Sequence, residues 1–383
     1  MSSVLVVATA GAGGDLQPLM AATLALRERG HEVTFLGDRA VARVATAAGC
    51  PAQPLPPDVD LGPALVAAIG EAMIATGGDV VAAGPIVQRR LSEWAARAAK
   101  PVRDAVARGS PDVVVTSLFG IEVVAIAARS CPWAVVNSTF YVGPNPPRSL
   151  EEDFAPRAVP LISRFASLTE TPSLMLHGTD RAFDLGFDGL PPRHHYVGPL
   201  GVWEPPTDPP AYLDEPGDPW VLVSISSQVQ DDVPMAEAAL AALADRPVRV
   251  VVTLGPGHSP DELSVVPPNA HVERTVSHDA VLARGALLVS HAGHGSVMKA
   301  LWRGRPMVLV PWGRDQPGVA ARAARLGVAE VVPRGDANAG TLAHAIDRVL
   351  GDQRMRERAA SHAARLSTTN PPGEAARLIE SLL

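Results

Sequence analysis

Residues 290–318 read SHAGHGSVMKALWRGRPMVLVPWGRDQPG and form the most informative local pattern in the chain. The apolar residues before this stretch predict a buried strand that ends at His291, and Gly293 and Gly295 allow a tight turn into a helix near Ser296. A glycine-rich turn at a helix start presents unpaired N–H groups to phosphate oxygens. Because Ser296 and His291 can donate to the same anion, the pattern predicts a phosphate site.

A second strand and a polar loop complete the stretch. Residues 307–310 predict the strand, and Asp315 and Gln316 end the loop after it. A carboxylate beside an amide suits the vicinal hydroxyls of a sugar, so the whole stretch predicts a nucleotide-sugar site. Two simpler interpretations stay open. Asp315 can cap a helix that begins near Pro317, and the stretch can be a strand–turn–helix without a ligand.

Composition excludes several classes of protein. The net charge is -7 and no basic cluster is present, which argues against a nucleic-acid partner. The 2 cysteines lie far apart, and no basic segment precedes the first strand, so we expect a cytoplasmic protein. Because no apolar run reaches about 20 residues, we expect no membrane span.

The organisation along the chain predicts the fold class. Short strand-like runs alternate with helix-like segments in both halves, which favours parallel βαβ units. The proline-rich residues 205–219 predict a linker between an N-terminal domain, 1–204, and a C-terminal domain, 220–383. Residues 51–95 and 138–172 break the rhythm and predict insertions along a cleft. We therefore expect an α/β protein with two Rossmann-like doubly wound domains facing a cleft.

The motifs resemble those of family 1 glycosyltransferases of the GT-B fold, especially enzymes that glycosylate actinobacterial natural products. H-x-G-x-G-S, a helix, G-x-P, a strand and D-Q resemble the donor signature, and similar segments stand at 10–19, 197–199 and 224–228. The resemblance implies a metal-independent hexosyltransferase without a cofactor. Its partners would be a UDP- or dTDP-sugar and a small-molecule acceptor. It also implies that a last helix, 373–383, crosses back onto the first domain, and it leaves a homodimer open.

The resemblance also implies roles for individual residues. The implied donor-binding residues are Ser226, Ser227, Val276, His291, Gly293, Gly295, Ser296, Asp315 and Gln316. His291 would bind the β-phosphate, and Ser296 with the Gly295 amide the α-phosphate. Asp315 and Gln316 would bind the sugar 3- and 4-hydroxyls, while Val276 would hold the nucleobase. An ordinary turn is the alternative interpretation of the two serines.

Two positions depart from the family pattern or stay ambiguous. Lys299 stands where plant-like members have a glutamate that bonds the ribose, and an ammonium cannot accept those hydrogen bonds. This is compatible with a dTDP-deoxysugar donor, but a surface lysine is an equally good interpretation. His278 lies either near the nucleobase or at the start of a helix that it caps.

Asp15 is the predicted general base of an inverting transfer. Residues 14–18 read GDLQP where many relatives have a histidine after the glycine, so a carboxylate occupies the matching position. A carboxylate with a pKa of about 3.9 is a weak base for an alcohol, which favours an aromatic acceptor with a phenol or an activated carbon. The alternative is that Asp15 caps the helix 16–29.

The acceptor site is predicted in the first domain. Asn137 and Phe140 follow a strand end and precede a proline-rich loop that suits a flat aglycone, and Met73, with Ile74 and Trp94, predicts an apolar wall. Core packing is the alternative for each.

Three other functions are alternatives to sugar transfer. A dehydrogenase fits poorly, because the turn at 11–15 lacks the third glycine of a dinucleotide motif. A nucleotide-sugar epimerase of the same fold and a non-catalytic GT-B partner protein stay open.

Overall fold

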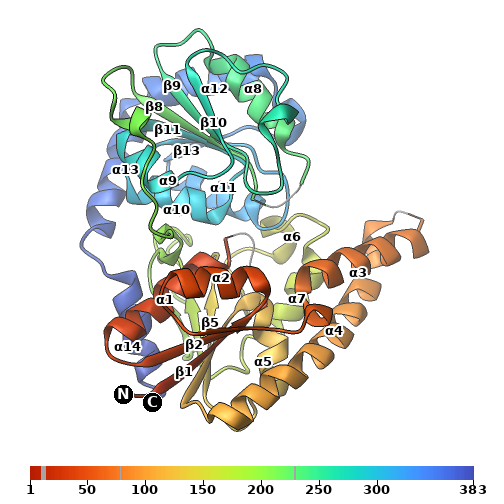
Figure 1. Cartoon of the computed structure of the whole chain (residues 1–383). Coiled ribbons are helices and arrows are strands. Elements are labelled where there is room, and N and C mark those ends of the chain that lie inside the picture. Colours follow the sequence, from red (N-terminus) through yellow and green to blue (C-terminus); the bar gives the residue numbers. More distant parts are fainter. Residues whose placement is uncertain (10–13, 78, 228–229) are drawn as a thin grey trace. The chain divides into compact units, whose positions relative to one another are not determined.

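The computed structural model describes residues 1–9, 14–77, 79–227 and 230–383. These residues form two compact units, which Figure 1 shows as separate sheets with their helices. Unit 1 contains residues 1–203 and 370–383, and unit 2 contains residues 204–369. The boundary thus lies one residue before the predicted one, and the proline-rich segment belongs to unit 2.

The sheet of unit 1 contains seven parallel strands. They are β1 Ser3–Ala8, β2 Glu32–Gly37, β3 Ala52–Pro54, β4 Val113–Ser117, β5 Trp133–Asn137, β6 Leu174–His177 and β7 His194–Tyr196. Their order is β3-β2-β1-β4-β5-β6-β7. The chain thus starts in the middle of the sheet, fills one edge, and returns to fill the other, which is the doubly wound topology expected from the sequence.

The helices of unit 1 connect these strands, and one arrives from the far end of the chain. They are α1 Leu16–Glu28, α2 Arg39–Ala47, α3 Leu61–Ala75, α4 Val80–Gly109, α5 Ile121–Ala127, α6 Leu150–Asp153, α7 Val159–Ala166 and α14 Pro371–Glu380. Helix α14 lies beside α1 (Figure 1). Glu380 forms ion pairs with Arg29 at 2.6 Å and His31 at 3.0 Å, which fastens the C-terminal helix to this unit.

We expect Ile379→Ala to destabilise unit 1 by about 2–5 kcal/mol, because a buried isoleucine loses its packing and leaves a cavity. Ile379 is fully buried in the same apolar cluster as Leu19 and Leu26 of α1. Urea denaturation measures the change. Leu383→Ala is the matched control, since Leu383 is 44% exposed and its loss should cost under about 0.5 kcal/mol. Equal stability of Ile379→Ala and the control would contradict the packing of α14.

Unit 2 repeats the architecture with six parallel strands. They are β8 Trp220–Ser224, β9 Arg249–Thr253, β10 Ala270–Glu273, β11 Gly285–Ser290, β12 Met307–Leu309 and β13 Ala329–Val331, in the order β10-β9-β8-β11-β12-β13. The helices are α8 Val233–Leu243, α9 His278–Arg284, α10 His294–Trp302, α11 Gln316–Arg325, α12 Ala339–Gly351 and α13 Gln353–Leu366. Parallel strands buried on both faces read as continuous apolar runs, as in VLV at 221–223.

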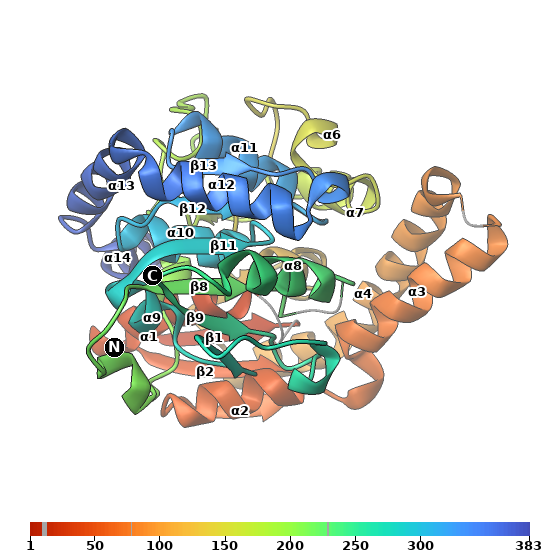
Figure 2. The same ribbon diagram turned by 90° about the horizontal axis from the view of Figure 1, so that it is seen from above.

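Residues 61–109 depart most from the sequence prediction. They form a hairpin of two helices, α3 and α4, that extends beyond the sheet of unit 1 in Figure 2. The sequence predicted an insertion without regular periodicity over residues 51–95, and α4 contains Gly84, Pro85 and Pro101. Gly84 has a packing reason to be there, since a Cβ at this position would lie 2.7 Å from the Pro160 ring of α7.

Candidate functional site

The carboxyl ends of three neighbouring strands form the candidate site of unit 2. Strand β11 lies between β8 and β12, with Ser290 in register with Ser224 on one side and Leu309 on the other. The predicted donor residues follow these strand ends. In doubly wound sheets, ligands bind at this edge, so the topology agrees with the sequence prediction for the position of the site.

His291 follows β11 and is held by the neighbouring strand. Its Nδ1 donates to the Ser224 carbonyl at 3.1 Å, and the side chain is 7% exposed. Burial lowers the pKa of His291, an effect that the hydrogen bond to Ser224 partly offsets. The other ring nitrogen, Nε2, packs on Gly293, where a Cβ would lie only 2.5 Å away. Gly293 is therefore required by the histidine as well as by the turn.

The turn after His291 leads directly into α10. Ala292 has a left-handed backbone with φ 66°, and Gly293 is the N-cap residue of the helix. The first N–H groups of a helix have no partner within the helix, and they carry the positive end of its dipole. Gly295 and Ser296 lie in this first turn, at the end of the sheet where the sequence predicted a phosphate site.

The Ser296 hydroxyl is hydrogen-bonded to the His278 ring. Its Oγ lies 3.3 Å from His278 Nδ1, and Nε2 of the same ring lies 3.0 Å from Thr253 Oγ1. Burial, together with the charge of Lys299, lowers the pKa of His278 to about 4. A neutral imidazole therefore positions the serine hydroxyl. Val276 is half-buried two residues before His278.

The capping interpretation of His278 is wrong. The N-cap residue of α9 is Ser277, whose Oγ accepts from the Ala280 N–H at 3.0 Å. The N–H of His278 donates to the Glu204 carboxylate at 3.1 Å instead.

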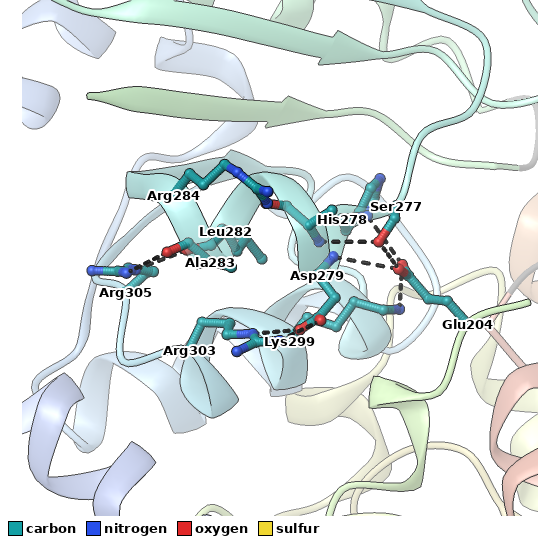
Figure 3. A network of polar contacts seen from close by, with 11 residues as sticks. Glu204, Ser277, His278, Asp279, Leu282, Ala283, Arg284, Lys299, Arg303 and Arg305 are labelled. Atoms are coloured by element: carbon teal, nitrogen blue, oxygen red, sulfur yellow. Dashed lines mark hydrogen bonds and ion pairs between the residues drawn. The ribbon is translucent and has the colours of Figure 1, made fainter. Parts of the chain in front are cut away.

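Lys299 is buried and paired, which corrects the surface interpretation (Figure 3). It is 3% exposed, and its Nζ lies 3.5 Å from Glu204 Oε1. The same carboxylate accepts from Ser277 Oγ at 2.6 Å and from the Asp279 N–H at 3.4 Å. The lysine charge is thus balanced within the protein, so a role in attracting phosphate is not supported. These bonds also explain why Glu204 belongs to unit 2.

Asp315 and Gln316 have different environments. Asp315 is half-exposed at the N-cap position of α11, and within the described residues its side chain makes no capping bond. Gln316 is 1% exposed; its Oε1 accepts from the N–H groups of Trp312 at 2.8 Å and Gly313 at 2.7 Å. The Gln316 amide therefore shapes the loop, and its binding of a sugar hydroxyl stays a prediction. Asp315 remains available for that role.

Ser226 belongs to a polar network that the sequence did not reveal. Its N–H donates to Asp232 Oδ2 at 2.8 Å, and its Oγ accepts from Arg314 Nη2 at 2.5 Å. Gln230 joins the network by donating to Asp232 Oδ2 at 2.9 Å. Ser227 is exposed, and Gln228 lies outside the described residues. The only sequence signal for Arg314 was its position beside Asp315.

Asp15 is the central residue of the candidate site in unit 1. It stands at the N-cap position of α1, but in the described part of the chain its side chain makes no capping bond to the helix. The carboxylate is 5% exposed and accepts from Ser138 Oγ at 3.0 Å. The capping interpretation is therefore wrong. Residues 11–13 of the preceding turn lie outside the described residues.

The environment of Asp15 changes its acidity. Burial raises the pKa of Asp15 to about 6, although the hydroxyls of Ser117 and Ser138 act in the opposite direction. The preference for an aromatic acceptor rested on an ordinary carboxylate pKa of about 3.9. A carboxylate with a pKa near 6 is a stronger base that is still mainly ionised at neutral pH. Perturbed carboxylates of this kind are typical of functional sites.

The predicted acceptor residues prove to be mainly structural. Asn137 is fully buried; its Nδ2 donates to the Phe140 carbonyl at 2.7 Å and lies 3.0 Å from His177 Nδ1. Phe140 is 1% exposed and packs on Phe154. Both side chains therefore pack in unit 1, and their acceptor roles stay predictions. Met73 is half-buried on α3, and its acceptor role stays a prediction.

An apolar pocket in unit 1 lies under the α3–α4 hairpin. It is lined by Leu61, Leu65, Leu91, Trp94, Phe119, Glu122, Leu161 and Phe165. Trp94 was predicted as part of an apolar wall and lies here, whereas Ile74 of that prediction is 86% exposed. Glu122 is paired with Arg164 at 2.6 Å, so the pocket presents chiefly apolar surface.

Within the described ranges, no three His, Cys, Asp or Glu side chains gather in a way that would hold a metal ion. None of the helices described here combines the length and apolar character needed to span a bilayer.

Two family models match the chain. The Glycosyltransferase family 28 N-terminal domain matches residues 5–89, and the Erythromycin biosynthesis protein CIII-like C-terminal domain matches residues 237–382. With these two matches and its two parallel sheets, the chain is similar to glycosyltransferases of the GT-B fold. The second match runs through α14, so the C-terminal family domain includes the helix that packs on unit 1.

Two curated relatives are similar to the chain over part of its length. The chain is 27% identical over 311 residues to demethyllactenocin mycarosyltransferase of Streptomyces fradiae, covering 74% of the chain and 66% of the relative. It is 32% identical over 222 residues to 4'-demethylrebeccamycin synthase of Lentzea aerocolonigenes, covering 57% of the chain and 52% of the relative. The chain thus spans between about half and two thirds of these relatives.

A solved structure agrees with the fold. The glycosyltransferase SnogD from Streptomyces nogalater matches with a TM-score of 0.71 at 19% identity, covering 100% of this chain and 99% of that chain. At this identity the likeness concerns the fold, with its two parallel sheets.

Proposed function

We propose that the protein transfers a sugar from a nucleoside-diphosphate sugar to a small-molecule natural-product acceptor, with inversion at the anomeric carbon. The observation that carries this proposal is the group formed by His291, Ser296 and the first turn of α10 at the end of β11. Hydrogen-bond donors of this kind stabilise the charge that develops on a departing diphosphate. Asp315, half-exposed on the next loop, would bind the hydroxyls of the transferred sugar.

Asp15 would serve as the base of the reaction. The acceptor oxygen attacks the anomeric carbon, the bond from that carbon to the diphosphate oxygen breaks, and the acceptor proton passes to the Asp15 carboxylate. The Ser138 hydroxyl at 3.0 Å would orient the carboxylate. Because burial raises the pKa of Asp15 to about 6, the argument that favoured phenols weakens, and the proposed acceptors include alcohols as well.

His291 would bind the diphosphate as an imidazolium. Its Nδ1 carries a proton, because that nitrogen donates to the Ser224 carbonyl. A hydrogen bond from Nε2 to phosphate then requires a second proton on the ring. The pKa of His291 in the unliganded protein is lowered, chiefly by burial, so the ring is neutral at pH 7 before binding.

We therefore expect nucleotide binding to take up a proton and to weaken as the pH rises. Between the lowered pKa of the free site and the higher pKa of the complex, affinity should fall by up to about tenfold per pH unit. Calorimetric titration of dTDP and UDP at pH 7.5, in two buffers with different ionisation enthalpies, measures the uptake. His291→Gln should abolish it. Binding without proton uptake in the wild type would exclude the imidazolium.

The proposed function is tested by incubating the enzyme with several dTDP- and UDP-sugars and a panel of aromatic and aliphatic natural products. Glycosides detected by mass spectrometry, in amounts equal to the nucleoside diphosphate released, would support transfer. Isomerised sugar nucleotide without released diphosphate would indicate an epimerase. Absence of both reactions, with no binding of UDP or dTDP, would indicate a non-catalytic partner protein. The same assay tests whether activity persists with a chelator, as the proposed metal-independent reaction requires.

A further inference from the structure

Arg314 reaches across the candidate donor site of unit 2. It lies in the loop after β12, and its Nη2 donates to Ser226 Oγ at 2.5 Å and to Gln230 Oε1 at 2.8 Å, two residues that follow β8. Because β11 stands between β8 and β12, the side chain must cross the carboxyl end of β11. That strand end is where His291 begins the turn into α10.

The hydrogen-bond partners of Arg314 carry no charge. Both hydrogen-bond acceptors are neutral oxygens, and no carboxylate among the described residues forms an ion pair with the guanidinium. Burial lowers the pKa of Arg314, while the charges of Asp315 and Asp232 raise it. A half-buried cation with neutral partners is unfavourable by itself, and an anionic ligand at the site would offset this cost.

The loop holds Arg314 in a strained conformation. Its φ of 53° lies in the left-handed region that a residue with a Cβ seldom adopts. The Gln316 side chain fixes Trp312 and Gly313, the two residues before Arg314, by accepting from their N–H groups. Strain that the surrounding structure maintains in this way is typical of functional positions.

We propose that Arg314 binds and neutralises the diphosphate of the nucleotide, an inference that rests on the proposed function. The charge on the diphosphate increases as its bond to the sugar breaks, and the guanidinium lies over the same strand end as His291. An arginine remains protonated at every working pH, whereas His291 must gain a proton to contribute. Arg314 therefore supplies the part of diphosphate binding that does not depend on pH.

The test compares nucleoside diphosphates with nucleosides in titrations of the full-length protein. Arg314→Gln should weaken binding of dTDP and UDP by about 10- to 100-fold, the usual range for a lost hydrogen bond to a charged group, and leave thymidine and uridine unchanged. Arg314→Lys keeps the charge and should lose less affinity for dTDP and UDP. If Arg314→Gln fails to fold, the same titrations are made with Arg314→Lys, which should lose affinity for the nucleoside diphosphates and keep its affinity for the nucleosides.

Arg305→Gln is the matched control. Arg305 is also partly buried and donates only to backbone carbonyls, those of Leu282 at 2.9 Å and Ala283 at 3.1 Å (Figure 3), but it precedes β12 at the opposite end of the sheet. Its replacement should leave diphosphate affinity within about twofold of the wild type.

Two results would overturn the assignment of Arg314. Unchanged diphosphate affinity in Arg314→Gln is one, and equal losses for nucleoside and diphosphate, which indicate a role only in loop structure, are the other. Failure of the proposed function is distinguishable, because the wild type itself would then bind neither dTDP nor UDP.

Discussion

Asp15→Asn is expected to lower kcat by about 100-fold or more while it stabilises the folded protein. The loss of activity follows from removing the proposed base, and 10²-fold is the lower end of its usual contribution. Asparagine keeps an oxygen that can accept from Ser138 Oγ, so the local geometry is preserved. Steady-state kinetics at saturating donor measure the effect. Turnover close to that of the wild type would leave Asp15 without a role in proton transfer.

The gain in stability follows from the raised pKa of Asp15. In the wild type, the folded protein holds the Asp15 proton more tightly than the unfolded chain does. The stability that this protonation contributes is complete below pH 3.8 and is lost as the pH rises through about 6. Above that pH the ionised, buried carboxylate costs about 2–3 kcal/mol relative to a neutral side chain. Asp15→Asn should therefore equal the wild type near pH 4 and exceed its stability by about this amount at pH 8.

Asp38→Asn is the matched control for both effects. Asp38 also stands at an N-cap position, but its side chain does cap α2, accepting from the Val41 N–H at 2.8 Å. Asparagine caps helices as well as aspartate does, so activity and stability should change little. Urea denaturation at pH 4 and pH 8 compares the three proteins. A stability difference between Asp15→Asn and the wild type that does not change with pH would contradict the raised pKa.

His291→Ala is expected to reduce kcat by about 10²–10³-fold, the scale found when one donor to a developing anion is removed. The same change should weaken dTDP or UDP binding and leave the dissociation constant of the acceptor nearly unchanged, because the ring lies in unit 2 beside the α10 turn. Kinetics at saturating donor separate loss of turnover from loss of affinity.

The exposed His344 of α12 provides the control for His291. His344→Ala removes the same side chain from the surface of the same unit and should leave turnover unchanged. Full activity of His291→Ala with donor at saturation would rule out a role for this histidine in stabilising the leaving diphosphate.

The topology could be predicted from local patterns, because parallel strands and glycine-ended helices leave periodic signals. The hairpin of α3 and α4 could not, because Pro85 and Pro101 normally end helices, and the reason for Gly84 is its contact with Pro160, 76 positions along the sequence. The family pattern predicted a donor site at residues 290–318 but did not reveal the hydrogen bonds of its side chains. Gln316, for example, accepts from two N–H groups of its own loop.

The remaining differences concern partners that are distant in sequence. A surface position for Lys299 stayed open in the sequence because its partner, Glu204, lies about one hundred residues earlier, just before the proline-rich segment. Arg314 gave no sequence signal beyond its position beside Asp315, because its acceptors follow another strand. The pKa of Asp15 depends on burial, which no local pattern reports. Each of these features arises from tertiary packing, and each changes the chemistry expected of the site.

Proton NMR of the anomeric centre, recorded while the enzyme consumes an α-linked dTDP- or UDP-sugar, distinguishes inversion from retention. If transfer inverts the anomeric carbon, the sugar first appears with β configuration, on the acceptor or on water, in step with released nucleoside diphosphate. If Asp15 is the base, Asp15→Asn slows transfer to the acceptor by about 100-fold or more. A product with retained α configuration would contradict inversion, and equal transfer rates in the wild type and Asp15→Asn would contradict the role of Asp15 as the base.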